Sequence, residues 1–168
     1  RRILAACARA ALDLGVRPRY FGRIPSPAVA AWGIACGMPS LMVTGSHIPE
    51  DRNGIKFNLP TGEILKSDED GIRAQSVVIP RGLFDASGAF AAGQLSALPA
   101  EEPDAYDRYV ERYLSFFPRG CLSGLRVGIY EHSSVARGAY GDVLTGLGAQ
   151  VTRLGYSERF IPVDTEAI

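Results

Sequence analysis

The segment that most constrains the fold of this chain runs from Leu125 to Tyr156. It reads as an apolar strand leading into a loop, "LRVGIYEHSS", then a helix, "VARGAYGDVLTGLGA", then a second apolar strand, "QVTRLGY". Two strands joined by a crossover helix pair in parallel, and the crossover is right-handed in nearly all proteins. The segment therefore predicts one β-α-β unit of an α/β fold.

The first residues of the chain also alternate between helix and strand patterns. A short strand is expected at 20–21, and a second helix within "RIPSPAVAAWGIACG", with Ser26 as its N-cap, Pro27 in its first turn and Gly37 at its end. A first helix is expected to end at Gly15, with these apolar residues on one face: Ile3, Leu4, Cys7, Ala11, Leu12 and Leu14.

Two strands and a third helix are predicted next. The run "SLMV" is short and continuously apolar, which is typical of a strand covered on both faces. After a polar loop, Ile55, Phe57 and Leu59 alternate as strand residues do, and "PTGE" reads as a turn into another strand. A helix is expected from Asp68 to Gln75.

Residues 80–102 lack clear periodicity, and a helix is predicted after them, within "PDAYDRYVERYLSFF". Glu101, Glu102 and Asp104 are expected to form a solvated helix start, and Trp32 is expected in the core or at a domain contact. An apolar and aromatic stripe on this helix predicts core packing, and its members are Tyr106, Tyr109, Val110, Tyr113, Leu114 and Phe117.

Composition argues against several kinds of partner and site. The net charge is zero and no apolar run approaches membrane-spanning length, so neither nucleic acid nor a membrane is expected as a partner. Cys7, Cys36 and Cys121 are far apart and form no CxxC, which disfavours a disulfide framework or a zinc site and indicates a reducing cytoplasm. Because Arg1 is not a methionine, we expect a piece of a longer chain.

The loop "VTGSHIPEDRNGIKF" lies between the two predicted strands. A structural turn is one explanation. A serine hydrolase fits poorly, because Ser46 and His47 are adjacent and would point opposite ways on an extended chain, and because the G-x-S-x-G spacing is absent. A Walker phosphate loop also fits poorly, because Gly45 and Gly54 are too far apart.

The same loop holds the groups that phosphoryl transfer requires. Its glycines allow backbone amides to approach an anion, and the Ser46 hydroxyl can carry a phosphoryl group. His47, Arg52 and Lys56 supply positive or proton-transferring groups. Loops at the ends of buried strands are also where open α/β sheets bind their ligands.

This loop resembles the phosphoserine loop of the α-D-phosphohexomutases, the phosphomannomutase and phosphoglucomutase family. The family loop reads roughly T-[AG]-S-H-x-P, with N-G-x-K a few residues on. "GRIPSPAVA" is similar to the family's G-x-x-[ST]-P-A segment, and "GEILKSDE" and "FIPVDTEAI" resemble phosphomannomutase-type members. Ile48 stands where asparagine is common. The matching residues are Thr44, Gly45, Ser46, His47, Pro49, Asn53, Gly54 and Lys56.

The resemblance implies roles for individual residues. Ser46 matches the phosphorylated serine, whose phosphate completes the coordination of Mg²⁺. His47 would support the phosphoryl group, and Lys56 matches the general acid/base. The implied reaction moves phosphate between C1 and C6 of a hexose through a hexose 1,6-bisphosphate. Residues implied to bind substrate or phosphate are Thr44, Gly45, Arg52 and Asn53.

The resemblance also implies the domain organisation. Residues 1–118 would form domain I, a mixed-sheet α/β/α sandwich lacking its N-terminal part, and residues 119–168 would begin a similar domain II. Such a fragment is expected to be inactive alone. A hexose phosphate is the expected substrate, but mannose, glucose and glucosamine phosphates stay open, as does the oligomeric state. The alternative is a non-catalytic fragment that binds a sugar phosphate or a partner protein.

Overall fold

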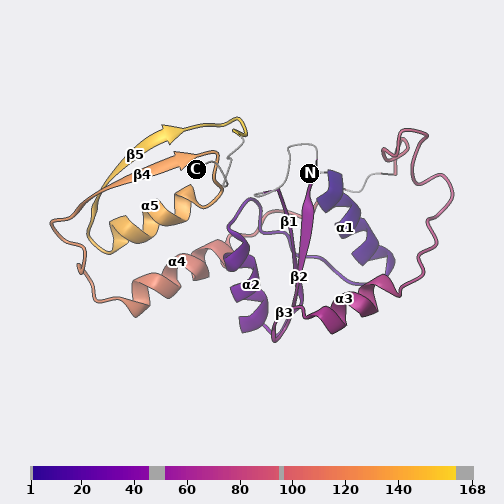
Figure 1. Ribbon diagram of the computed structural model, residues 1–168, viewed down its shortest axis with the longest axis horizontal. Coiled ribbons are helices and arrows are strands. Elements are labelled where there is room, and N and C mark those ends of the chain that lie inside the picture. The colour runs from indigo at the N-terminus through magenta and orange to yellow at the C-terminus, as the bar shows by residue number, and fades with distance from the viewer. Residues whose placement is uncertain (1, 46–51, 95–96, 162–168) are drawn as a thin grey trace. The chain divides into compact units, whose positions relative to one another are not determined.

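The computed structural model describes residues 2–45, 52–94 and 97–161 (Figure 1). The chain divides into two compact units, and each unit is built from two separate stretches of sequence. This division follows contacts within the structure. The family domains predicted from the resemblance, residues 1–118 and 119–168, stay a prediction. Unit 1 comprises Arg1–Tyr20 and Glu63–Glu102, and unit 2 comprises Phe21–Gly62 and Pro103–Ile168.

Helix α1 (Arg2–Asp13) lies in unit 1 and confirms the first predicted helix. Its buried residues are Ala5 and Ala8, whereas Ile3 is 38% exposed and Leu12 is 45% exposed. The predicted apolar face is therefore confirmed only in part. Leu4, Cys7 and Ala11 are half-buried, whereas Ile3, Leu12 and Leu14 are exposed.

Helix α3 (Lys66–Arg73) also lies in unit 1 and begins two residues before the predicted start. The reason is a cap: Asp68 Oδ2 accepts a hydrogen bond of 2.8 Å from the backbone N of Leu65. A carboxylate at the third helical position satisfies an amide that would otherwise lack a partner, and it complements the positive end of the helix dipole.

The region without periodicity forms turns rather than long elements among its described residues. Asp85 organises one turn, since its Oδ1 accepts from Ser87 Oγ at 2.6 Å, from Ser87 N at 2.8 Å and from Ala89 N at 3.1 Å. These hydrogen bonds, the one from Ser87 Oγ first, hold the pKa of Asp85 below its usual value. The expected strand at 20–21 is reduced to one parallel bridge between Tyr20 and Glu101.

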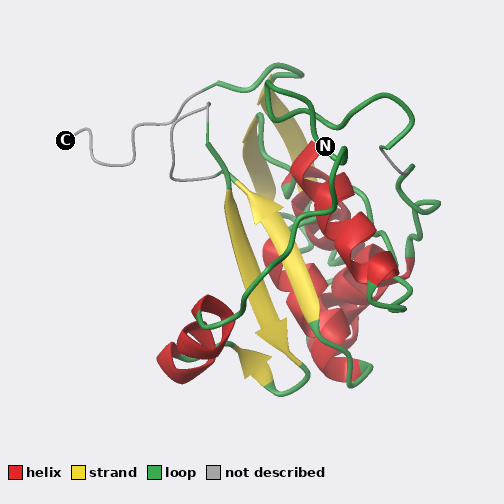
Figure 2. Cartoon of the chain, turned by 90° about the vertical axis from the view of Figure 1, so that its right-hand side faces the viewer, coloured by secondary structure: helices red, strands yellow, loops and turns green. Residues whose placement is uncertain are grey.

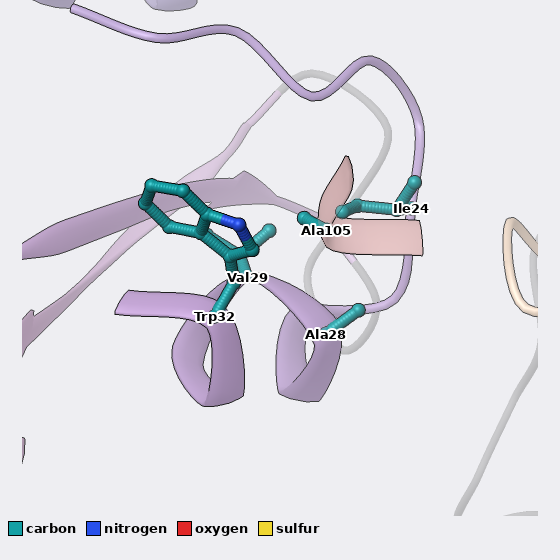
Figure 3. Close-up of a cluster of buried hydrophobic side chains, with 5 residues drawn as sticks. All are labelled: Ile24, Ala28, Val29, Trp32 and Ala105. Carbon is teal, nitrogen blue, oxygen red and sulfur yellow. The ribbon is translucent and has the colours of Figure 1, made fainter. Parts of the chain in front are cut away.

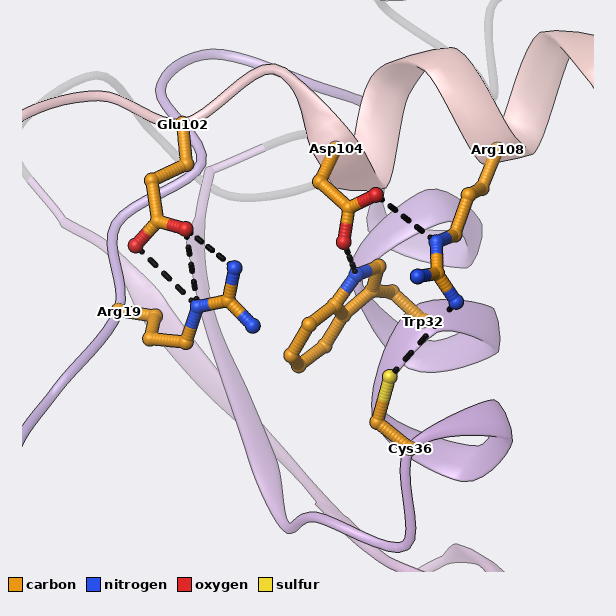
Figure 4. Close-up of polar contacts among 6 residues, drawn as sticks. All are labelled: Arg19, Trp32, Cys36, Glu102, Asp104 and Arg108. Atoms are coloured by element: carbon orange, nitrogen blue, oxygen red, sulfur yellow. Dashed lines mark hydrogen bonds and ion pairs between the residues drawn. The ribbon is translucent and has the colours of Figure 1, made fainter.

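Glu102 is not a freely solvated residue, in contrast to the expectation. Its carboxylate accepts hydrogen bonds from Arg19 Nε at 3.0 and 3.2 Å and forms an ion pair with the same guanidinium (Figure 4). The backbone N of Glu102 also donates to the carbonyl of Tyr20 at 2.9 Å. These contacts tie the two stretches of unit 1 together.

Helix α2 (Ser26–Ala35) lies in unit 2. Its N-cap is Pro25 and not Ser26, so the predicted cap was wrong by one residue, and no side chain caps this end. Pro25 has the extended backbone of an N-cap, with φ of −59° and ψ of 142°. Pro27 in the first turn is confirmed, since that position needs no backbone donor.

Helix α2 ends at Ala35, with Cys36 as its C-cap, and Gly37 directly after the cap stops the helix as predicted. Gly37 has φ of 63°, a left-handed conformation that favours glycine. Its N–H donates to Ile34 O at 3.2 Å, and the N–H of Met38 donates to Gly33 O at 2.8 Å. This pair of bonds is a Schellman motif, which satisfies the last carbonyls of the helix and reverses the chain.

Strand β1 (Ser40–Thr44) follows this reversal and pairs antiparallel with β2 (Gly54–Leu59), confirming both predicted strands (Figure 2). Strand β3 (Gly62–Glu63) follows a turn, and the strand order is β1-β2-β3. Every β1 residue is only half-buried, so full cover on both faces is not observed. The apolar residues of β2 are each between 37% and 40% exposed, and they are Ile55, Phe57 and Leu59.

The core of unit 2 forms around Trp32, which is 5% exposed, as predicted. Phe21, Met42, Tyr106 and Tyr109 pack against its edge. The core therefore joins α2 and the sheet to the later part of the chain. The buried members of this cluster are Ile24, Ala28, Val29, Trp32 and Ala105 (Figure 3).

Helix α4 (Asp104–Phe116) supplies the other side of this core. Asp104 is not simply solvated, since its Oδ2 accepts from Trp32 Nε1 at 2.6 Å and its Oδ1 accepts from Arg108 Nε at 2.8 Å (Figure 4). Most of the predicted stripe is half-buried. Phe117 was predicted wrongly, because the helix has ended before it and its side chain is 42% exposed.

The C-terminal part of unit 2 confirms the predicted β-α-β unit. Strand β4 (Arg126–His132), helix α5 (Arg137–Gly146) and strand β5 (Gln150–Tyr156) follow in order, and the two strands pair in parallel from Arg126 opposite Gln150 onward. The α/β fold class is thus confirmed. Within the described ranges, no helix has the length and apolarity needed to cross a membrane.

Candidate functional site

The structure describes part of the loop that the sequence singled out. Ser46 and His47 lie outside the described residues, which resume at Arg52. Thr44 closes strand β1, and Lys56 lies within β2. The predicted roles of all these residues stay predictions, and the structure supplies the framework that would hold them.

The antiparallel register brings the two halves of the motif face to face. Thr44 is the cross-strand partner of Gly54, and Met42 is the partner of Lys56. A Cβ added to Gly45 would lie 3.6 Å from the carbonyl O of Arg52 and 3.7 Å from Asn53 Oδ1. The two ends of the loop therefore meet in space, although the motif is interrupted in the sequence.

Lys56 lies on the same face of the sheet as Met42 and Thr44, because directly paired residues and every second residue share a face. Met42 packs against the core around Trp32, so this is the face that α2 covers. The Lys56 side chain is nevertheless exposed. It lies two residues from Gly54, a spacing of about 7 Å along a strand, which suits a long side chain reaching the loop.

Helix α2 adds a feature that the sequence analysis did not foresee. A Cβ on Gly33 would lie 3.1 Å from Ser40 Oγ, so the C-terminal part of α2 contacts the start of β1. Because the chain reverses at Gly37, α2 runs antiparallel to β1 (Figure 1), and its N-terminus is directed toward the end of β1 where the loop leaves. The positive end of the helix dipole favours an anion at that end.

The resemblance of the loop implies a bound Mg²⁺. Among the residues that the structure describes, no group of three or more His, Cys, Asp or Glu side chains is arranged to hold a metal ion. Mg²⁺ prefers several oxygen ligands, including carboxylates. The described residues alone therefore do not provide the ligands of a magnesium site.

His132 ends β4, and Ser133 and Ser134 follow it in the loop that leads to α5. Ser134 Oγ accepts a hydrogen bond of 3.1 Å from the backbone N of Ala136, which stabilises the turn before α5, although no side chain caps the helix itself. The Ser133 hydroxyl contacts His132 Nδ1 at 3.0 Å, and His132 has φ of 50°. Arg137, to which the sequence analysis gave no role, holds the same loop through a hydrogen bond of 3.0 Å to His132 O.

The chain was compared with known proteins. Residues 1–77 match the family described as phosphoglucomutase/phosphomannomutase, alpha/beta/alpha domain I. A phosphomannomutase of Sinorhizobium fredii (strain NBRC 101917 / NGR234) is 46% identical over 166 residues, which are 99% of this chain and 34% of that protein. A phosphomannomutase of Salmonella muenchen is 42% identical over 163 residues, which are 97% of this chain and 32% of that protein.

More distant relatives carry a different substrate in their name. A phosphoglucosamine mutase of Gluconacetobacter diazotrophicus is 32% identical over 146 residues, which are 86% of this chain and 31% of that protein. The chain spans about a third of the length of the curated relatives it matches. The family match, the similarity along nearly the whole chain and the confirmed α/β fold agree with the resemblance of the loop. The chain belongs to the phosphoglucomutase/phosphomannomutase family of phosphohexomutases.

Proposed function

We propose that this chain is part of a hexose phosphate mutase, an enzyme that interconverts 6-phospho and 1-phospho sugars. The observation that carries the proposal is the β1–β2 hairpin, which sets Thr44 opposite Gly54 and so joins the two halves of the phosphoserine motif. The direction of α2 supports the proposal as well, because the N-terminus of this helix favours a phosphate at the end of the sheet where Thr44 and Gly54 pair.

In this proposal Ser46 carries the phosphoryl group of the resting enzyme. The bond between the Ser46 oxygen and phosphorus breaks as the hydroxyl oxygen of a sugar monophosphate forms a bond to phosphorus. Lys56 takes the proton of that hydroxyl. The resulting hexose 1,6-bisphosphate then transfers its other phosphate to the Ser46 oxygen. Lys56 donates the proton to the sugar oxygen that this transfer releases. His47 and Arg52 stabilise the charge of the transferred group.

Magnesium belongs to the proposal as an electrostatic stabiliser of the transferred phosphate. Its ligands would be the phosphate on Ser46 together with carboxylates that the described residues do not provide. A cytoplasmic location, predicted from cysteine usage, stays a prediction.

The names of the relatives support mannose phosphate as the substrate, and the description of the matching family supports mannose or glucose phosphate. The relatives with the higher identity, 46% and 42%, are called phosphomannomutases. A phosphoglucosamine mutase is the second candidate, because relatives with that name are 32–35% identical. Comparing turnover of the three sugar phosphates by the full-length enzyme would decide between them.

The decisive test is phosphate on Ser46. Intact-protein mass spectrometry before and after phosphatase treatment should reveal one removable phosphate, and peptide mapping should assign it to Ser46. Ser46→Ala should abolish it, whereas Ser40→Ala should not, because Ser40 Oγ already accepts a hydrogen bond of 3.2 Å from Asn58 Nδ2 within the sheet. Phosphate that is absent, or that maps to Ser40 or Ser26, would contradict the assignment.

A non-catalytic sugar-phosphate-binding or interaction protein is the alternative. We expect the 168-residue chain alone to show no turnover in a coupled assay with mannose 1-phosphate and an activating hexose bisphosphate. The full-length enzyme should turn over in the same assay. Turnover by the chain alone would require an active site other than the one proposed, and a phosphorylated but inactive full-length enzyme would favour the alternative.

A further inference from the structure

Unit 2 contains a second polar site, at the carboxyl ends of the parallel strands β4 and β5. A pocket of about 410 Å³ opens there beside the start of α5. Ser133 and Ser134 of the β4–α5 loop line it, together with residues that follow β5. The carboxyl ends of parallel strands are where α/β sheets commonly bind ligands. The position of this pocket is therefore suited to binding rather than to folding alone.

Arg137 presents a fixed positive charge at this pocket. Its Nη1 donates to His132 O at 3.0 Å and to Ser157 O at 2.8 Å, and its Cζ lies 4.3 Å from the centre of the Tyr156 ring. Both hydrogen-bond acceptors are neutral carbonyls. No carboxylate in the described part of the chain forms an ion pair with Arg137, so its charge is held in place and not neutralised.

A second arginine of the pocket has its charge neutralised. Arg153 Nη1 donates to Glu131 Oε1 at 2.6 Å, and the Glu131 side chain is only 3% exposed. Arg153 also packs over Gly141 of α5, where a side chain would clash with the guanidinium. The ion pair with the buried Glu131 carboxylate thus fixes Arg153 in the wall of the pocket. The guanidinium groups of Arg23 and Arg137 stay available to a ligand.

Arg23 brings a third guanidinium from the segment before α2. It is exposed, and within the described ranges it has no hydrogen bond or ion pair. The lining thus carries three arginines against two glutamates, Glu131 and Glu158. The excess charge is positive, and two guanidinium groups without a carboxylate partner lie beside the serine hydroxyls of the loop.

We propose that this pocket binds a phosphate monoester. Arginine guanidinium groups match the geometry of phosphate oxygens and bind them in a bidentate manner. Arg137 is already immobilised, which lowers the entropic cost of binding. Arg23 and Arg137 would hold the phosphate, and the Ser133 and Ser134 hydroxyls would bind its remaining oxygens. The proposal does not depend on a phosphate at Ser46.

The test is an NMR titration of the ¹⁵N-labelled 168-residue chain carrying Ser46→Ala, so that the hairpin cannot hold a phosphoserine. Separate titrations use inorganic phosphate, glucose 6-phosphate and glucose. We expect the two phosphates to shift the amide signals of residues 133–138 saturably and glucose to shift none. Tighter binding of glucose 6-phosphate than of inorganic phosphate would identify an organic ester as the ligand, and equal binding would identify free phosphate. Either result supports an anion site.

Variants then separate the site from general electrostatics. Arg23→Ala should weaken phosphate binding about tenfold or more, equivalent to about 1.4 kcal/mol, because it removes a charge-assisted contact. Arg126→Ala is the matched control, since Arg126 is an exposed arginine at the opposite end of β4. It should leave the affinity unchanged. An equal loss in both variants, shifts spread over the whole surface, or the absence of saturable binding would overturn the proposal.

Discussion

Gly33→Ala should destabilise unit 2, although alanine is the better helix former. Gly33 is a buried residue of α2, and a Cβ at this position would lie 2.8 Å from the backbone O of Met38 and 3.1 Å from Ser40 Oγ. The Met38 backbone cannot easily retreat, because its N–H is bonded to Gly33 O at 2.8 Å in the Schellman motif. The substitution therefore pushes α2 away from β1.

The expected loss of stability in Gly33→Ala is the difference between two opposing effects. Replacing glycine by alanine within a helix contributes about 1 kcal/mol of stability. Overpacking costs about 1–3 kcal/mol, and a clash with fixed backbone belongs in the upper part of this range. The net loss in the free energy of unfolding of unit 2 should be about 1–2 kcal/mol.

Gly71→Ala provides the matched control. Gly71 lies within α3, and nothing is within 4 Å of a Cβ placed there. This substitution should stabilise the helix by about 0.5–1 kcal/mol. Urea unfolding followed by tryptophan fluorescence reports on unit 2, because Trp32 is the chain's single tryptophan. Far-UV circular dichroism reports the total helix content, to which α3 contributes. An unchanged or higher fluorescence midpoint for Gly33→Ala would refute the reasoning.

Three further results are expected. In the full-length enzyme, Lys56→Ala should lower kcat about 10²–10⁴-fold and Lys56→Arg should restore little, because guanidinium stays protonated. Full activity of Lys56→Arg would exclude proton transfer. Burial and the Tyr113 hydroxyl raise the pKa of Tyr109 to about 12. Its contribution to stability is therefore complete below about pH 10 and lost as the pH rises toward 12. Unfolding of Tyr109→Phe followed by circular dichroism should show a smaller loss of stability over this range, because Tyr106, whose pKa is also raised, still contributes one. Burial raises the pKa of the Cys7 thiol, so a thiol reagent should modify it more slowly than the exposed Cys36 and Cys121.

Local patterns in the sequence predicted the elements of unit 2 well. The β4–α5–β5 unit was predictable because two apolar strands flank a segment of helical length. The end of α2 was predictable because Gly37 supplies a left-handed conformation that other residues adopt at a cost. The hairpin followed from alternation in β2, although the pairing of Thr44 with Gly54 needed the structure.

Contacts between distant residues could not be predicted from the sequence. The hydrogen bond from Trp32 to Asp104 and the pairing of Arg19 with Glu102 join residues that no local pattern connects. The apolar pattern of α1 likewise did not show that Ala5 and Ala8 would be its buried residues. Arg137 was missed because an arginine after a strand has no distinctive motif.

The interleaving of the two units has a consequence for how the chain must be handled and how it folds. Residues 63–102 of unit 1 interrupt the two stretches of unit 2, so no single proteolytic cut can release either unit intact. A nick in the exposed segment 74–80 should leave both parts associated under native conditions, and they should separate only on denaturation. Each unit must also close a long loop before its core can form, which raises the contact order and slows folding.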